Sequence, residues 1–325
     1  MVIRRLERER FIMDISVPGQ DKKAPSKTVP MRRTAEQEAA EDRAAFAAMA
    51  SLPPEGIALY AEDVGVKKAH YDTLTLVVLA IMGGAYISIG ALFATIVQSG
   101  ADGMMAFGLT KLLGGLVFST GLILVVVAGA QLFTSDSLLV IAWASRRITT
   151  REVIRVWVLV WLGNLVGALL LALIVFLSGQ YMAGHGVVGE TALYYASTKA
   201  NLPVGQAFFM AIMCNVLVSL GAWVAYAGRS IADKIVAIIF PISAFIAAGF
   251  EHCVANMYFV PLGLFIKWGA PDKFWADLGH EAPSIPVDHY LMNLGVVTFG
   301  NVIGGAVCVG AMYWIAFRRP GRPRH

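Results

Sequence analysis

Apolar residues run along the chain in long segments, each followed by a short polar stretch, behind a polar N-terminal region. A helix needs about 20 apolar residues to cross a bilayer, and each segment reaches that length. The pattern predicts an all-α membrane protein with a six-helix transmembrane domain over 71–318, an N-terminal segment over 1–70 and a basic tail over 319–325. The six segments are roughly 73–98, 109–145, 153–178, 205–228, 234–267 and 289–317.

Lysine and arginine are concentrated in the loops on one side of these segments. In membrane proteins, the cytoplasmic loops carry an excess of these two residues. The loops of the other side, 99–108, 179–204 and 268–288, contain only Lys199 and Lys273. We therefore expect both termini to be cytoplasmic, in a bacterial inner (plasma) membrane. The clustered residues are Arg146, Arg147 and Arg151 after the second segment, Arg229 and Lys234 after the fourth, and Arg318, Arg319, Arg322 and Arg324 after the sixth.

The N-terminal segment is charged and contains prolines, and no apolar run follows its early arginines closely enough to form a secretory signal. Residues 1–34 are predicted to be disordered, and 35–50 and 54–69 to form short helices at the membrane surface.

Composition supports a membrane protein, because 57% of the residues are hydrophobic and only 15% are charged, against roughly 45–50% and 25% in soluble domains. The net charge of +4 does not indicate nucleic-acid binding, since the basic residues lie in loops and tails. Cys214, Cys253 and Cys308 lie in apolar segments without metal-ligand spacing, so we expect buried free thiols and no metal or cofactor.

The fifth segment contains an acid and a base in the middle of apolar sequence. Glu251 and His252 lie near the midpoint of the 32 residues between Lys234 and Lys267. A straight helix of that length would run about 48 Å, against a hydrocarbon core of about 30 Å. Ionisable groups at bilayer depth persist mainly where they face protein or a water-filled cavity. We expect the helix to break at this pair, on a transport pathway.

The second segment is also too long, with 34 residues between Lys111 and Arg146. Near its centre, residues 129–136 read Gly-Ala-Gln-Leu-Phe-Thr-Ser-Asp. Non-helical backbone at that depth is tolerated only when buried in protein or lining a cavity. The two interruptions are therefore predicted to face one another, with Thr134 near His252.

Two similarities relate the first three segments to the last three. Residues 86–94 resemble residues 217–225, and residues 163–168, which begin Gly163-Asn164, resemble residues 300–305, which begin Gly300-Asn301. Each half has three segments, so the halves run in opposite directions through the membrane. Such inverted repeats build transporters and channels with sites at the midplane.

These motifs resemble the formate–nitrite transporter family over roughly residues 70–318, and the formate channels in particular. The resemblance implies an aquaporin-like fold and a homopentamer with one anion pore in each protomer. It also implies a small monovalent anion as substrate, formate first, with nitrite or hydrosulfide as alternatives. Gln131 and Ser135 depart from the family pattern, where Glu and Gly are frequent. The motifs are Leu132-Phe133-Thr134, Lys199, Cys214-Asn215, residues 225–230 and residues 249–257.

The resemblance also implies roles for single residues. His252 is similar to the central pore histidine and Thr134 to its partner across the pore. Lys199 resembles the basic residue that attracts anions at the outer vestibule, and Asn215 a polar pore-lining residue. The apolar positions that narrow the pore correspond to Leu122, Phe133 and Phe245, with Leu132 beside Phe133 and Phe118 one turn from Leu122.

Near the break, Glu251 is expected to be structural and to accept backbone N–H groups that the interruption frees. Asn256, Asn164 and Asn301 are expected to do similar packing work. His252 is expected to lend a proton to formate in transit, which would make passage pH-dependent or proton-coupled. The alternatives without a role in transport are a His252 that only packs between helices and a Lys199 that is an ordinary loop residue.

Two other classes of protein fit less well. An intramembrane enzyme could use Glu251 and His252 as acid and base, but the sequence has neither His-Glu-X-X-His nor Gly-X-Ser-X-Gly. A neutral-solute pore of the aquaporin type lacks the paired Asn-Pro-Ala motif. We therefore expect a channel, not an enzyme, whose partners are a small anion, membrane lipid and copies of itself.

Overall fold

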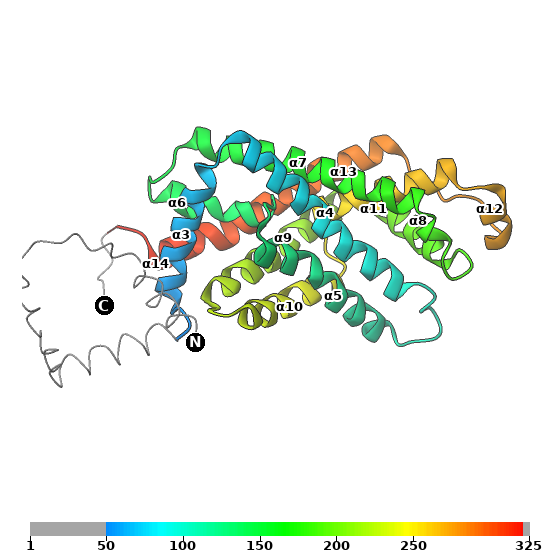
Figure 1. The fold of residues 1–325 in the computed structure, drawn as a ribbon, viewed down its shortest axis with the longest axis horizontal. Helices are drawn as coiled ribbons and strands as arrows, with labels where there is room; N and C mark the ends of the chain where they lie inside the picture. The colour runs from blue at the N-terminus through cyan, green and yellow to red at the C-terminus, as the bar shows by residue number, and fades with distance from the viewer. Residues whose placement is uncertain (1–49, 321–325) are drawn as a thin grey trace, which may run out of the picture. The chain divides into compact units, whose positions relative to one another are not determined.

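A computed structural model describes residues 50–320 of the chain, and every regular element in that range is helical (Figure 1). The expected all-α fold is confirmed for these residues. The disorder predicted over 1–34, the helix predicted over 35–50 except its last residue, and the tail from 321 onward lie outside the described residues.

Five helical stretches of the described chain are long and apolar enough to cross a membrane. The fifth predicted segment differs from these, because it consists of α10 (Ile231–Ala247) and α11 (Cys253–Gly269), with 17 residues each. Neither half reaches the roughly 20 residues of a full crossing. The five stretches are Thr73–Gln98 (α4), Phe107–Gly129 (α5, Phe107–Ile123, with the π-helical η2, Leu124–Gly129), Thr150–Leu177 (α7), Val204–Ala227 (α9), and Val287–Phe317 (α13, Val287–Val302; the π-helical η5, Ile303–Ala311; α14, Met312–Phe317).

Capping side chains begin several of these helices where polar sequence meets apolar sequence. The Asp72 carboxylate accepts the Thr75 N–H at the start of α4. Thr149 starts α7 and Ser230 starts α10, each with a reciprocal capping box. Such caps satisfy N–H groups that the first helical turn leaves without partners, so the crossings start at defined residues.

Small residues bring the helices of each half into close contact. A Cβ at Gly167 of α7 would overlap the Ile81 carbonyl of α4, and one at Gly304 in η5 would overlap the Ile212 carbonyl of α9. Glycine at these positions lets the backbones touch, as is common in membrane helices. The first and third crossings thus pack as the fourth and sixth do, in agreement with the predicted inverted repeat.

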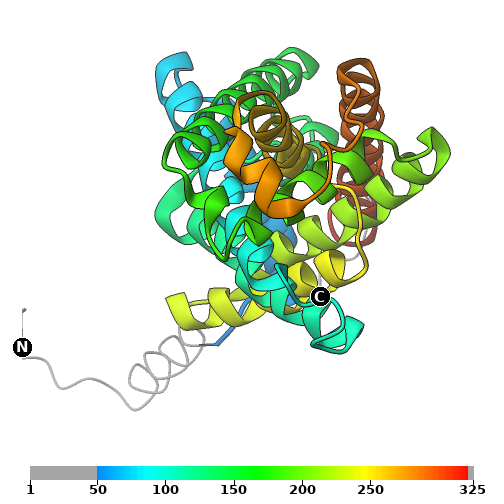
Figure 2. The same cartoon turned by 90° about the vertical axis from the view of Figure 1, so that its right-hand side faces the viewer.

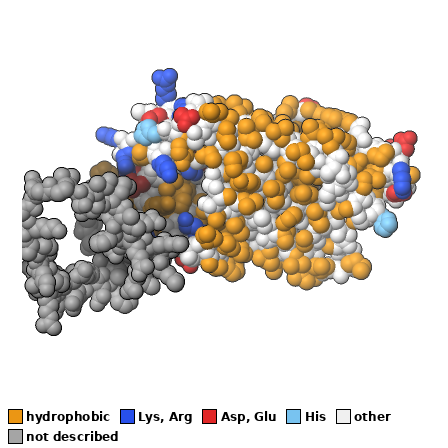
Figure 3. Space-filling model, in the orientation of Figure 1, with side chains coloured by type: hydrophobic (Ala, Val, Ile, Leu, Met, Phe, Trp, Pro, Cys, Tyr) orange, Lys and Arg blue, Asp and Glu red, His pale blue; other side chains and the backbone are white. Residues whose placement is uncertain are grey.

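Hydrophobic side chains cover the middle of the face shown in Figure 3, and charged side chains gather at its two ends. One end carries α3 (Pro54–Ala69), the helix predicted over 54–69, and the other carries α8 (Val187–Ala200) and α12 (Asp272–Leu278) (Figures 1 and 2). This distribution is the one expected of an integral membrane protein, whose apolar band lies in lipid.

Two sequence-based expectations are wrong. The stretches 179–204 and 268–288, interpreted as loops, contain the helices α8 and α12, and α8 packs on α11. Cys308 is exposed, whereas Cys214 and Cys253 are buried as predicted. An apolar crossing has an outward face that lipid covers, so hydrophobic surroundings in sequence do not require burial inside the protein.

Candidate functional site

Both long segments are interrupted, as predicted, and each interruption contains a glycine in the left-handed region. Gly129 has φ +88° at the end of η2, and Gly249 has φ +72° after α10. Residues other than glycine rarely adopt such backbone angles. After the first break the chain resumes as a short 3₁₀ turn, Ser135–Leu138 (η3), and as α6, Leu139–Ala144.

The two breaks meet at Thr134 and His252. Thr134 Oγ1 lies 3.0 Å from His252 Nε2, although 118 residues separate them in sequence. Both side chains are buried, at 0% and 2% exposure. The predicted proximity of this hydroxyl and this imidazole is confirmed.

Backbone contacts assign the tautomer of His252. The residue is the N-cap of α11, and its Nδ1 accepts the Ala255 N–H at 3.1 Å. A neutral imidazole has one donor and one acceptor nitrogen, so we place its proton on Nε2. Nε2–H then donates to Thr134 Oγ1, which leaves the hydroxyl proton of Thr134 available to a third partner.

Aromatic rings close around this pair. The Phe245 ring lies 5.9 Å from the His252 ring at an interplanar angle of 25°, and Phe118 meets Phe245 edge-on at 5.4 Å. Leu122 is buried and belongs to the same hydrophobic core. These contacts place Phe245 at the imidazole and Phe118 against Phe245, and the role of all three residues in narrowing a pore stays a prediction.

The other two predicted constriction residues directly precede Thr134. Leu132 is fully buried, and Phe133 packs against Trp157 with ring centroids 6.5 Å apart. Both therefore fix the backbone that carries the hydroxyl, whereas the ring that contacts the imidazole is that of Phe245.

The prediction that Glu251 accepts freed backbone N–H groups is wrong. Its carboxylate instead binds two side chains, Lys199 Nζ at 2.8 Å and Asn256 Nδ2 at 2.6 Å. Glu251 and Lys199 are largely buried, at 5% and 13% side-chain exposure. Lys199 therefore stands at the break as half of an ion pair, and not as a free charge in a loop.

Asparagine side chains do the work expected of Glu251. Asn164 accepts the Phe133 N–H, and Asn301 accepts the Cys253 N–H, both at 2.9 Å. Each satisfies a buried donor that an interrupted helix leaves without a partner. The packing role predicted for these two residues is confirmed.

Asn215 holds the Thr134 backbone. Its Nδ2 donates to the carbonyl oxygens of Thr134 and Asn301, at 3.1 and 2.6 Å, and to Ser137 Oγ at 3.1 Å. The side chain is fully buried. It links the first break to Asn301 of α13, and its proposed place in the pore lining stays a prediction.

A chamber leads from the α8 end toward the break at Glu251. Its volume is about 150 Å³, and its lining includes Lys199, Gly249 and Glu251 together with Lys111, a residue that sequence reasoning treated only as the boundary of a segment. A lysine at the end of an apolar run is a weak indication by itself, because loop lysines are common there.

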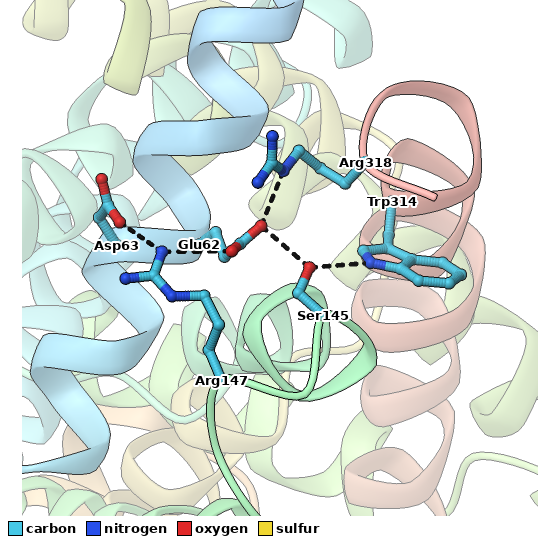
Figure 4. Close-up of polar contacts among 6 residues, drawn as sticks. All are labelled: Glu62, Asp63, Ser145, Arg147, Trp314 and Arg318. Atoms are coloured by element: carbon cyan, nitrogen blue, oxygen red, sulfur yellow. Dashed lines mark hydrogen bonds and ion pairs between the residues drawn. The ribbon is translucent and has the colours of Figure 1, made fainter. Parts of the chain in front are cut away.

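At the opposite end, salt bridges fasten α3 to the crossings. Lys68 Nζ lies 2.6 Å from Asp136 Oδ1, two residues beyond Thr134. Glu62 is 2% exposed and accepts hydrogen bonds from Arg318, Ser145 and Arg147, at 2.7, 2.9 and 3.2 Å (Figure 4). Sequence reasoning missed this cluster, because its members come from distant parts of the chain.

Within residues 50–320, no group of three His, Cys, Asp or Glu side chains is placed to hold a metal ion.

Known proteins of similar sequence identify the family to which the chain belongs. The profile described as formate/nitrite transporter matches residues 55–315. Formate channel FocA of Escherichia coli (strain K12) is 42% identical over 273 residues, which are 82% of this chain and 95% of that protein. Formate channel FocA of Haemophilus influenzae is 40% identical over 264 residues, 80% of this chain and 93% of that protein.

A solved structure agrees with these relatives. A pentameric formate channel with formate bound superposes with a TM-score of 0.72 at 41% identity, over 76% of this chain and 98% of its own. These proteins are channels and not enzymes. The chain belongs to the formate/nitrite transporter family.

Proposed function

We propose that the protein passes small monovalent anions, formate first, through one pore in each protomer of a homopentamer. The membrane is a bacterial plasma membrane, with both termini in the cytoplasm. The observation that carries this proposal is the buried contact between Thr134 and His252 at the meeting point of two broken helices. The names of the relatives support formate, and the solved pentamer supports the assembly.

The chemistry of the pair fits an anion that has lost its water. An anion sheds hydration at any apolar constriction, and that loss is costly unless new hydrogen bonds replace it. The Thr134 hydroxyl proton is free to donate to a carboxylate oxygen. The rings of Phe118 and Phe245 exclude water around the same point.

Proton transfer through His252 has a definite requirement. To give a proton to formate and stay neutral, the imidazole must first carry two protons, the second of them on Nδ1. Nδ1 now accepts the Ala255 N–H, so this loading breaks a cap hydrogen bond of α11. An anion beside the ring stabilises the imidazolium and offsets that loss. Passage of the bare anion at high pH and of formic acid at low pH would follow.

The test is radiolabelled formate flux into proteoliposomes, at an acidic and a neutral pH, in competition with nitrite, hydrosulfide, acetate and glycerol. Formate uptake that the small anions inhibit and glycerol does not is the expected result. Passage of glycerol without passage of anions would instead favour a neutral-solute pore.

The role of His252 needs its own comparison. His252→Phe is expected to abolish the pH dependence of uptake, whereas His289→Phe, at an exposed histidine, is the matched control. An unchanged ratio of formate to protons in the His252 variant would refute the relay and leave the channel function standing.

A further inference from the structure

Lys111 lines two adjoining cavities on the path to His252. The inner one is the chamber of about 150 Å³ that ends at Glu251, the neighbour of His252. The outer one measures about 540 Å³. Both are lined by Gln98, Lys111, Tyr194 and Tyr195, so they adjoin one another.

The charge of the inner chamber comes from Lys111. Its charged lining residues are Lys111, Lys199 and Glu251. The last two neutralise one another across 2.8 Å. Lys111 makes no ion pair within residues 50–320. Among the described charges that line the chamber, that of Lys111 is therefore the one without an ion-pair partner, and the chamber lining carries a net charge of +1.

The outer cavity has the opposite balance. Asp102 and Glu190 join Lys111 in its lining, so two acidic groups stand against one basic group. Clefts with low-dielectric walls focus the field of such charges. The charge of the lining therefore changes from net negative in the outer cavity to net positive in the inner chamber.

Two aromatic rings hold the Lys111 ammonium. Nζ lies 5.6 Å from the ring centroid of Phe107 and 5.7 Å from that of Tyr195. Such contacts attract a cation without using its N–H donors. The Gln98 amide lies over Gly114, where a Cβ would overlap it, one turn from Lys111. An amide and an ammonium thus line the same wall.

We propose that Lys111 is a capture site for a small monovalent oxyanion such as formate, one station outward of the Lys199–Glu251 pair. This inference rests on the proposed function, since it supplies that pore with its substrate. A cavity of about 150 Å³ is large enough to bind a molecule the size of benzene. The chamber thus has room for an ion as small as formate.

The test compares Lys111→Gln with wild type, Lys111→Arg and Lys273→Gln. Lys273 is an exposed lysine of α12 whose ion pair with Asp277 lies outside both cavities, which makes its variant the matched control. Initial rates of radiolabelled formate uptake are measured against formate concentration, at low and at high ionic strength, in proteoliposomes of the full chain.

At low ionic strength, Lys111→Gln is expected to raise the half-saturating formate concentration about tenfold, because local concentration of the ion is lost. The maximal rate stays unchanged, and high salt removes the difference by screening. Lys111→Arg and Lys273→Gln behave as wild type. A half-saturating concentration in Lys111→Gln equal to that in Lys273→Gln overturns the inference.

If Lys111→Gln does not assemble, Lys111→Cys in a Cys308→Ser background gives the same comparison after assembly. Reaction of the cysteine with a positively charged alkylammonium thiosulfonate is expected to restore the low half-saturating formate concentration, whereas an uncharged reagent of equal size is not. Equal half-saturating concentrations for the two adducts overturn the inference. A wild-type protein that passes no formate contradicts the proposed function itself. Formate passage that is insensitive to Lys111 contradicts only the capture site.

Discussion

Asn164 and Asn301 make the same three hydrogen bonds in opposite halves of the molecule. Each accepts one backbone N–H of a break and donates to two carbonyl oxygens, one in the break and one in the neighbouring crossing, at 2.6 to 2.9 Å. The inverted repeat is therefore preserved in the atoms that stabilise the interrupted helices. The partners are Phe133 N, Gln131 O and Ala80 O for the first, and Cys253 N, Glu251 O and Ala211 O for the second.

Replacing either asparagine by alanine should destabilise the protein strongly. Each change leaves one N–H and two C=O groups buried without these partners, and a buried unsatisfied group costs about 1–3 kcal/mol. We expect Asn164→Ala and Asn301→Ala to lower the melting temperature of the detergent-solubilised protein by similar amounts. Gln206→Ala, at an exposed amide side chain of α9, is the control and should melt as wild type. A normal melting temperature for either buried variant would contradict this account.

Loss of the Thr134 hydroxyl should slow formate passage without unfolding the protein. Valine has nearly the same shape but no O–H, and a hydrogen bond to a charged group contributes about 1.5–3 kcal/mol. Thr134→Val should therefore reduce flux about tenfold or more, whereas Thr134→Ser, which keeps the hydroxyl, should retain most of it. Flux in proteoliposomes measures both, with melting temperature as a check on folding. Equal flux in the valine and serine variants would exclude donation by this hydroxyl.

The membrane crossings followed closely from sequence, because a bilayer sets the length and hydropathy of a helix that spans it. The first crossing, predicted over 73–98, is Thr73–Gln98. The breaks were also predictable, since Glu251 and His252 lie in the middle of an overlong apolar run. The proximity of Thr134 followed from pairing the two interruptions.

The partners of the charged groups did not follow from sequence. Lys199 and Glu251 are 52 residues apart, and no periodic pattern connects them. Glu251 was expected to bind backbone, yet the asparagines of the repeat already satisfy the freed N–H groups, which leaves its carboxylate to lysine. Lys111 resembled an ordinary segment boundary until the fold placed it in the chamber. Tertiary packing, and not local propensity, decides such contacts.

Lys199 and Glu251 should depend on each other for stability. Removing one member of a buried ion pair leaves the other charge uncompensated, at a cost of about 3–5 kcal/mol. We expect Lys199→Gln and Glu251→Gln each to destabilise the protein, and the double variant to be less destabilised than the sum of the two. Melting temperatures of the four proteins form a double-mutant cycle. Strict additivity would show that the 2.8 Å contact contributes no coupling.

Glu62 should make the attachment of α3 sensitive to acid. Burial raises the pKa of this carboxyl, but hydrogen bonds from Arg318, Ser145 and Arg147 and the charge of Arg318 outweigh burial and hold the pKa below its ordinary value of 4.5. A group whose pKa is lower in the folded protein stabilises it above the unfolded pKa. This stabilisation is therefore fully present above about pH 4.5 and is lost as the pH falls through the folded value.

Glu62→Gln should remove this dependence. The variant is expected to be less stable than wild type at neutral pH by about 2 kcal/mol. The reason is that the buried hydrogen bonds from Arg318, Ser145 and Arg147 lose their charged carboxylate acceptor (Figure 4). Below pH 4.5 the two proteins should converge, as wild type loses what the variant already lacks. Melting temperature against pH measures the convergence, and proteolysis within α3 locates it. Asp63→Asn is the control, since Asp63 is 55% exposed and shares only Arg147. Parallel curves for wild type and Glu62→Gln throughout the acid range would assign the acid sensitivity to other carboxyl groups.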